Sequence, residues 1–232
     1  MGFIVPILMC AAFIFIWILL TKWIIRLDRR RMKRSLLRSE RLDTKSTAAL
    51  LSLCFGGKLF LYDRWFPKRS PKGTLYEAVP CIMLFGKKIF VLEVCYFPGV
   101  FRNTGEEVWK VIPPAEYTAK KEIQIKNPAL LAKNRASLLM ELLNTVGKPF
   151  DISVESMVIF TDKDHRLAVP GQKDLYTVKE AITYLSGFAP KTKQERRKMK
   201  IANKIISGMF GRYSLSRRQA ISRNNKMRAK KK

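Results

Sequence analysis

An uncharged stretch near the start of the chain constrains the fold more than any other feature. Residues 2–20 contain no charged side chain, and Trp23, Ile24 and Ile25 extend the apolar character beyond Lys22. A helix needs roughly 20 apolar residues to cross a bilayer. Residues 1–25 therefore predict a transmembrane helix. A buried core helix is the alternative. A cleaved signal peptide does not fit, because it requires preceding basic residues and a small-residue cleavage site, and neither is present.

A basic segment follows this stretch directly. Residues 26–42 read RLDRRRMKRSLLRSERL and predict a helical juxtamembrane stalk. Basic residues next to a membrane segment stay on the cytoplasmic side, and near the surface they attract anionic lipid. The pattern predicts a single-pass protein of the cell membrane whose C-terminal domain is cytoplasmic.

The charge of the chain is concentrated at its two ends. Lys and Arg total 45 against 18 acidic residues, which gives a net charge of +27. Residues 191–232 alone hold 16 Lys or Arg and a single acid, Glu195, whereas residues 43–190 hold 20 and 15. Hydrophobic residues make up 47% of the chain, too many for a disordered protein. The middle of the chain is therefore an ordinary globular domain between two basic flanks.

Several kinds of chemistry are excluded by composition. His165 is the only histidine, so a histidine cluster for metal binding is absent from the sequence. The four cysteines include no CxxC pair, which excludes a zinc knuckle and a thioredoxin-like motif. No P-loop, GxSxG or HExxH motif is present.

The middle of the chain predicts a mixed α/β domain. Branched and aromatic runs predict strands at 58–65, 75–85, 89–96, 108–112 and 154–161. Helices are expected at 44–54, at 129–146 after Asn127-Pro128, and at 177–188, where Thr177 and Glu180 form a capping pattern. This alternation favours an α/β fold with a central mixed sheet.

Residues 89–101, IFVLEVCYFPGVF, resemble the core motif of the nuclease-related domain (NERD) family. Trp109, Asn127-Pro128 and the strand at 157–160 extend the resemblance, which covers about residues 43–188. It implies a restriction-endonuclease-like fold. In such nucleases, an Asp and a Glu on adjacent strands hold Mg²⁺, and a Lys two residues after the Glu assists the attacking water.

The sequence departs from this motif where the chemistry is performed. Glu93 matches the glutamate, but Cys95 stands at the lysine position and Pro80 at the aspartate position. Leu131 replaces a glutamine that the family places shortly after Asn-Pro. Proline and cysteine side chains supply no hard oxygen ligand for Mg²⁺. We therefore expect a degenerate domain without a metal site or cofactor.

Two alternatives to this non-catalytic interpretation stay open. In the first, Glu77 replaces the missing aspartate and Lys87 or Lys88 replaces the lysine, which would make a membrane-tethered Mg²⁺-dependent nuclease. In the second, the protein is a structural subunit of a membrane complex.

The C-terminal segment, residues 189–232, predicts a basic amphipathic helix followed by a disordered remainder. Apolar residues recur every three to four positions from Met199 to Phe210, and we expect the helix to break near Gly208 and Gly211. The candidate binding residues are basic: Arg196, Arg197, Lys198, Lys200, Lys204, Arg217 and Arg218. Such a helix suits anionic membrane lipids, the phosphates of DNA or RNA, or an acidic protein partner. The sequence thus predicts a non-catalytic protein that binds nucleic acid or a partner at the membrane face.

Overall fold

The computed structural model describes residues 4–39, 41–55, 60–71, 73–103, 107–114, 122–147, 151–169 and 174–229, without the side chains of residues 4–13 and 228. The chain divides into two compact units, Met1–Ser39 and Glu40–Lys232. The C-terminal segment belongs to the second unit together with the middle of the chain.

The first unit is one helix, α1 (Ile4–Arg38). The predicted membrane span at residues 1–25 is wrong: none of the helices in the described part of the chain is long and apolar enough to cross a bilayer. Where side chains are described, the apolar stretch is short, because Ile14–Leu20 is soon followed by Lys22 and Arg26 along the same helix. Residues 1–3 and the side chains of 4–13 lie outside the described part.

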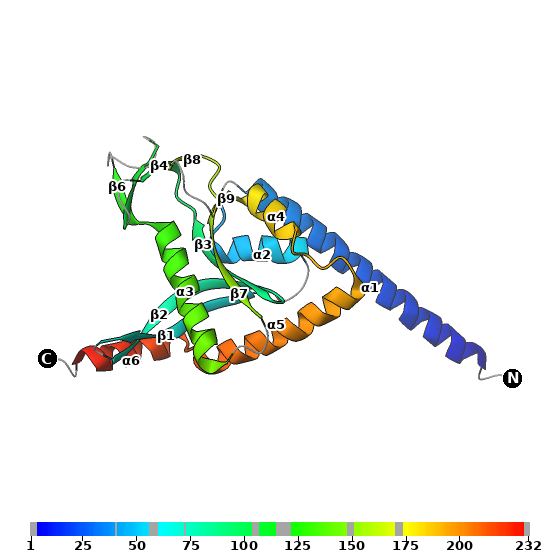
Figure 1. The fold of residues 1–232 in the computed structure, drawn as a ribbon. Helices are drawn as coiled ribbons and strands as arrows, with labels where there is room; N and C mark the ends of the chain where they lie inside the picture. The colour runs from blue at the N-terminus through cyan, green and yellow to red at the C-terminus, as the bar shows by residue number, and fades with distance from the viewer. Residues whose placement is uncertain are drawn as a thin grey trace. The chain divides into compact units, whose positions relative to one another are not determined.

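A five-stranded mixed sheet organises the second unit (Figure 1). Its order is β1 (Phe60–Ser70), β2 (Gly73–Phe85), β3 (Lys88–Cys95), β7 (Ser153–Phe160) and β9 (Leu175–Thr177). The first three strands are antiparallel, and β7 and β9 continue parallel to β3. The expectation of a mixed α/β domain with a central mixed sheet is therefore confirmed.

A second sheet has four strands in the order β6 (Ile123–Lys126), β5 (Val108–Ile112), β4 (Gly99–Asn103) and β8 (His165–Ala168). Its inner side chains Phe101, Trp109 and Val111 pack with Val158 and Phe160 of β7. This small sheet covers the end of the molecule at which β3 and β7 finish.

Helices cover both faces of the large sheet (Figure 1). On one face lie α3 (Pro128–Val146) and α5 (Lys193–Tyr213); on the other lie α2 (Thr44–Phe55) and α4 (Val178–Ser186). The Asn127 side chain accepts hydrogen bonds from the N–H groups of Ala129 and Leu130, and Thr177 forms a full capping box with Glu180. The predicted starts of α3 and α4 are therefore confirmed, since each depends on neighbouring residues alone.

The C-terminal segment differs from the expectation. Helix α5 is unbroken at Gly208 and Gly211, and α6 (Arg217–Ala229) forms where a disordered remainder is predicted. Ile206 and Phe210 are buried in the core shared with α3, and the Phe210 ring meets Phe66 of β1 edge-on at 5.3 Å. Residues 193–229 are therefore a folded part of the domain.

Candidate functional site

Glu93 lies on the face of β3 that α3 covers. Ile89 and Val91, which precede it at alternate positions, pack in the same core as Leu138, Leu139 and Leu142 of α3. Its carboxylate accepts a hydrogen bond from Arg135 of α3, and the two side chains are 19% and 14% exposed. Burial raises the pKa of Glu93 above its ordinary value, while the neighbouring guanidinium opposes that rise. The lone carboxylate is therefore already paired with a cation of the protein itself.

The other positions that the sequence resemblance singles out lie near this pair and bring no oxygen ligands. Pro80 comes one residue beyond the pair Cys81–Leu92, so the antiparallel register places it opposite Glu93. Cys95, two residues further along β3, is buried, and that burial, together with the charge of Glu93, raises the pKa of its thiol to about 12. Leu131 lies one turn before Arg135 on α3, on the same side of the helix.

These residues do not fit Mg²⁺. The ion requires several hard oxygen ligands, and this location offers one carboxylate that an arginine occupies, beside a protonated thiol and a proline. In the part of the chain that the structure describes, no group of three or more His, Cys, Asp or Glu is placed to hold a metal ion.

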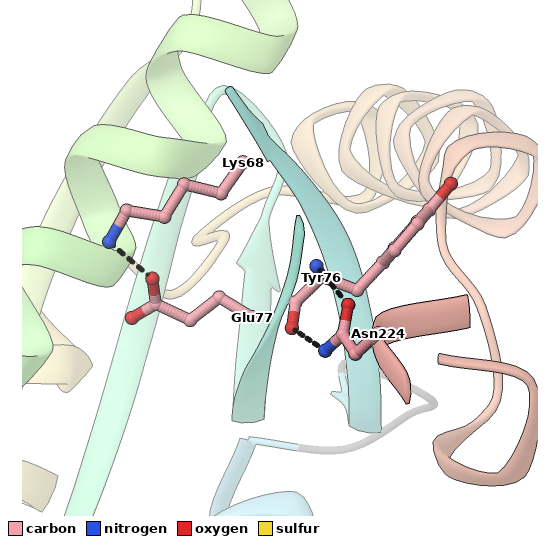
Figure 2. Close-up of polar contacts among 4 residues, drawn as sticks. All are labelled: Lys68, Tyr76, Glu77 and Asn224. Carbon is pink, nitrogen blue, oxygen red and sulfur yellow. Dashed lines mark hydrogen bonds and ion pairs between the residues drawn. The ribbon is translucent and has the colours of Figure 1, made fainter. Parts of the chain in front are cut away.

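Glu77 is engaged elsewhere. It lies three residues before Pro80 on β2, which is about 10 Å at the rise of a strand, and its carboxylate pairs with Lys68 of β1 at 2.6 Å (Figure 2). No described hydrogen bond or ion pair joins Glu77 to Glu93.

The two candidate lysines lie at the other end of β3. Lys88 shares the sheet face of Phe90 and Leu92, which is opposite to the face of Glu93. Its ammonium group pairs with Glu155 of β7 and lies 4.4 Å from the ring centroid of Phe188. Lys87 lies exposed in the β2–β3 turn. Five residues of strand separate Lys88 from Glu93, about 17 Å. The structure does not bring Glu93, Glu77 and these lysines together.

The basic residues of the C-terminal segment are exposed on fixed helices. Asn203, Ile206 and Phe210 form the buried side of α5, and the cations occupy other positions. The seven predicted binding residues are all exposed, and none forms an ion pair with a described residue: Arg196, Arg197, Lys198, Lys200 and Lys204 on α5, with Arg217 and Arg218 at the start of α6. Glu195, the only acid of this segment, is used in the capping box of α5.

Two asparagines fasten these helices to the backbone of β2. Asn203 accepts a hydrogen bond from the Gly86 N–H at 2.8 Å and donates one to the Leu84 carbonyl at 3.1 Å. Asn224 of α6 accepts from the Tyr76 N–H and donates to the Tyr76 carbonyl, both at 2.9 Å (Figure 2). Each amide therefore satisfies one backbone donor and one acceptor, as a neighbouring strand would.

The second asparagine closes an exposed edge of the sheet. Tyr76 faces Pro67 on β1, and proline has no N–H to offer. The pairing of β3 with β2 extends only from Cys81 to Phe85, which leaves Tyr76 outside it. Unpaired strand edges attract other chains, and here α6 covers the edge. The Arg223 guanidinium adds a hydrogen bond to the Tyr76 hydroxyl at 2.9 Å.

Sequence reasoning missed Arg135, Asn203 and Asn224. Arg135 lies one helical turn after the Leu131 position that the resemblance singles out, so this spacing was the available signal. The asparagines gave none, because their partners lie 117 and 148 residues away.

Comparisons with known proteins do not assign the chain to a family. No family model, no curated protein and no solved structure matches the chain.

Proposed function

We propose that this protein binds nucleic acid without catalysis, through the phosphate backbone and without reading base sequence. The observation that carries the proposal is a set of exposed cations on α5 and at the start of α6 that form no ion pair within the described ranges of the chain. The core and the amides of two asparagines hold these helices in place. Lys and Arg on a rigid surface neutralise phosphates and release counterions, which supplies most of non-specific affinity.

The geometry around Glu93 supports the non-catalytic part. Arg135 neutralises the only carboxylate of the motif, and Pro80 and Cys95 add no oxygen ligand. The nuclease alternative needs Glu77 and either Lys87 or Lys88 beside Glu93. Glu77 and Lys88 are paired with other residues, and Lys87 lies in the turn at the far end of β3.

The test is a titration of the full chain with labelled duplex DNA and single-stranded RNA at several salt concentrations. One variant carries Arg196→Gln, Arg197→Gln, Lys200→Gln and Lys204→Gln. The matched control removes four exposed cations elsewhere in the same unit: Lys126→Gln, Lys133→Gln, Arg166→Gln and Lys179→Gln. Both variants change net charge equally, so only the location differs.

We expect the α5 variant to bind duplex DNA at least about tenfold more weakly. The slope of log K against log salt should fall by roughly 1 for each phosphate that the variant no longer neutralises. The control should retain most of its affinity. Equal reductions in both variants, or binding that is insensitive to salt, would contradict the proposal. Mg²⁺-dependent cleavage of the DNA that a Glu93→Gln variant abolishes would overturn its non-catalytic part.

The same titration separates the remaining alternative. If the protein is a structural subunit without a nucleic-acid partner, we expect no salt-dependent DNA binding at all. If the α5 surface binds an acidic protein instead, we expect no DNA binding that depends on these four residues.

A further inference from the structure

A pocket of about 690 Å³ lies beside α5, away from Glu93. The β2–β3 turn, the segment from 187 to 191 and the first half of α5 form its walls. Its apolar lining includes Phe85, Phe188, Pro190, Met199 and Ile201. The volume and the predominantly apolar lining match pockets that bind small molecules.

The charged groups of this pocket are mostly cationic. Lys87, Lys191 and Lys198 line it, and none of them forms an ion pair with a described residue. The one acid in the lining, Glu195, is already engaged, since one carboxylate oxygen accepts hydrogen bonds from the N–H groups of Lys191 at 2.7 Å and Thr192 at 3.2 Å. Three ammonium groups therefore stand beside the apolar hollow against one carboxylate, that of Glu195, whose charge also interacts with Lys191 and Lys198, so the lining keeps an excess of positive charge.

The walls are held in place before any ligand arrives. Asn203 ties α5 to Gly86 and Leu84 through its amide. Gly86 has φ +63°, and a Cβ built on it would lie 3.5 Å from Met199 Cγ, so the turn and the helix pack closely. The Phe188 ring packs on Phe90 with the ring centroids 5.5 Å apart. A preformed pocket avoids the cost of ordering its walls on binding.

We propose that this pocket binds an anionic amphiphile that has a single acyl chain, such as a fatty-acid carboxylate. The chain gains free energy by leaving water for the apolar lining, and the carboxylate pairs with Lys87, Lys191 and Lys198. A phosphate-rich ligand would leave the apolar lining uncovered, and a neutral apolar ligand would leave the ammonium groups without partners. Lys198 belongs both to this pocket and to the cationic residues of α5, whereas Arg196, Arg197, Lys200 and Lys204, which the nucleic-acid test changes, do not line the pocket.

The test is calorimetric titration of the full chain with dodecanoate below its micelle concentration. Dodecyltrimethylammonium, which has the same chain and the opposite charge, and butanoate, which has the same head and a short chain, serve as ligand controls. We expect dodecanoate to bind at least about tenfold more tightly than either. Equal binding of the cationic amphiphile, or no binding of dodecanoate, would overturn the proposal.

Two variants locate the binding on the protein. Lys87→Gln with Lys198→Gln removes two pocket ammonium groups, and Lys193→Gln with Lys200→Gln removes two exposed cations of α5 that do not line the pocket. All four residues are exposed, so we expect both variants to fold. Dodecanoate affinity should fall about tenfold or more in the first variant and stay within about twofold in the second; an equal fall in both would contradict the assignment.

An acyl chain with an anionic head can be a free fatty acid or a bilayer lipid. Sedimentation with phosphatidylglycerol vesicles distinguishes them: vesicle binding that needs Lys87 and Lys198 assigns the pocket to a bilayer lipid. Dodecanoate binding without such vesicle capture assigns it to a free fatty acid.

Discussion

Charged side chains lie in two different settings in this protein, a mostly buried one at Glu93 and an exposed one on the helices α5 and α6. At Glu93, a charged group lies in a mostly buried setting and is neutralised by Arg135, a residue 42 positions away. On α5 and α6, many cations stay exposed and form no ion pair with a residue that the structure describes, while the buried side of the helices carries apolar and amide groups. At the first location the sequence predicted the remnant of a catalytic centre, and the structure shows an ion pair within the protein. At the end of the chain the sequence predicted a disordered remainder, and the structure shows a helix with exposed cations.

This comparison predicts first that α5 is part of the core. Phe210→Ala should lower the free energy of unfolding by about 3–5 kcal/mol, because Phe210 is 1% exposed and leaves a cavity against Phe66. Urea unfolding followed by circular dichroism measures the effect. The control is Tyr213→Ala on the same helix, where 43% exposure predicts a change within about 0.5 kcal/mol. Equal small effects would mean that α5 does not belong to the cooperative unit.

Breaking the ion pair should cost slightly less. Arg135→Met leaves the carboxylate of Glu93 without its partner, and we expect a destabilisation of about 2–3 kcal/mol at pH 7, below the range for fully buried pairs because both groups keep some exposure. The double variant with Glu93→Gln removes the unpaired charge as well and should recover most of this stability. A double variant as unstable as the single one would show that Arg135 acts through packing instead of charge.

The pH dependence of this penalty gives a sharper prediction. Burial raises the pKa of Glu93 above 4.5 in the folded protein, and Arg135 opposes the rise. A carboxyl with a raised folded pKa contributes stability that is fully present below its unfolded pKa and is lost as the pH rises through the folded pKa. Since Arg135→Met removes the opposing charge, its penalty should shrink from about pH 7 to about pH 4.5. The double variant lacks the carboxyl, so its own stability should carry no contribution from the titration of Glu93. The stability difference between the Arg135→Met single variant and the double variant should therefore shrink over the same pH range.

The hydrogen bonds of the two asparagines should rank below these effects. Asn203 is buried, so Asn203→Ala leaves the Gly86 N–H and the Leu84 carbonyl unsatisfied and should cost about 2 kcal/mol. Asn224 is half-buried, and Asn224→Ala should cost about 1 kcal/mol, because water can replace part of the hydrogen bonding that the amide gives to the Tyr76 backbone.

Asn225→Ala provides the matched control, since Asn225 is the exposed neighbour of Asn224 and its amide makes no described hydrogen bond. Amide hydrogen exchange at Gly86 and Tyr76 tests the same hydrogen bonds locally. Unchanged exchange in both variants would show that α5 and α6 do not depend on these amides.

Local signals in the sequence determined much of this protein. Asn127-Pro128 and Thr177 with Glu180 set the starts of α3 and α4, because capping involves residues within one helical turn. Branched runs predicted β3 and β7, whereas the place of Pro80 opposite Glu93 came from the register of the sheet. The basic composition of α5 was also evident, because charge is carried by residues regardless of their fold.

The tertiary structure alone decided what these elements do together. Arg135 reaches Glu93 because α3 crosses the face of β3 at one particular rotation, and Asn224 reaches Tyr76 across 148 residues of sequence. The sequence pattern also predicted a membrane span and a disordered C-terminal end, and the structure contradicts both. Local patterns report the period and the termini of an element, whereas the partner of a side chain depends on how distant elements pack, and that information is spread over the whole chain.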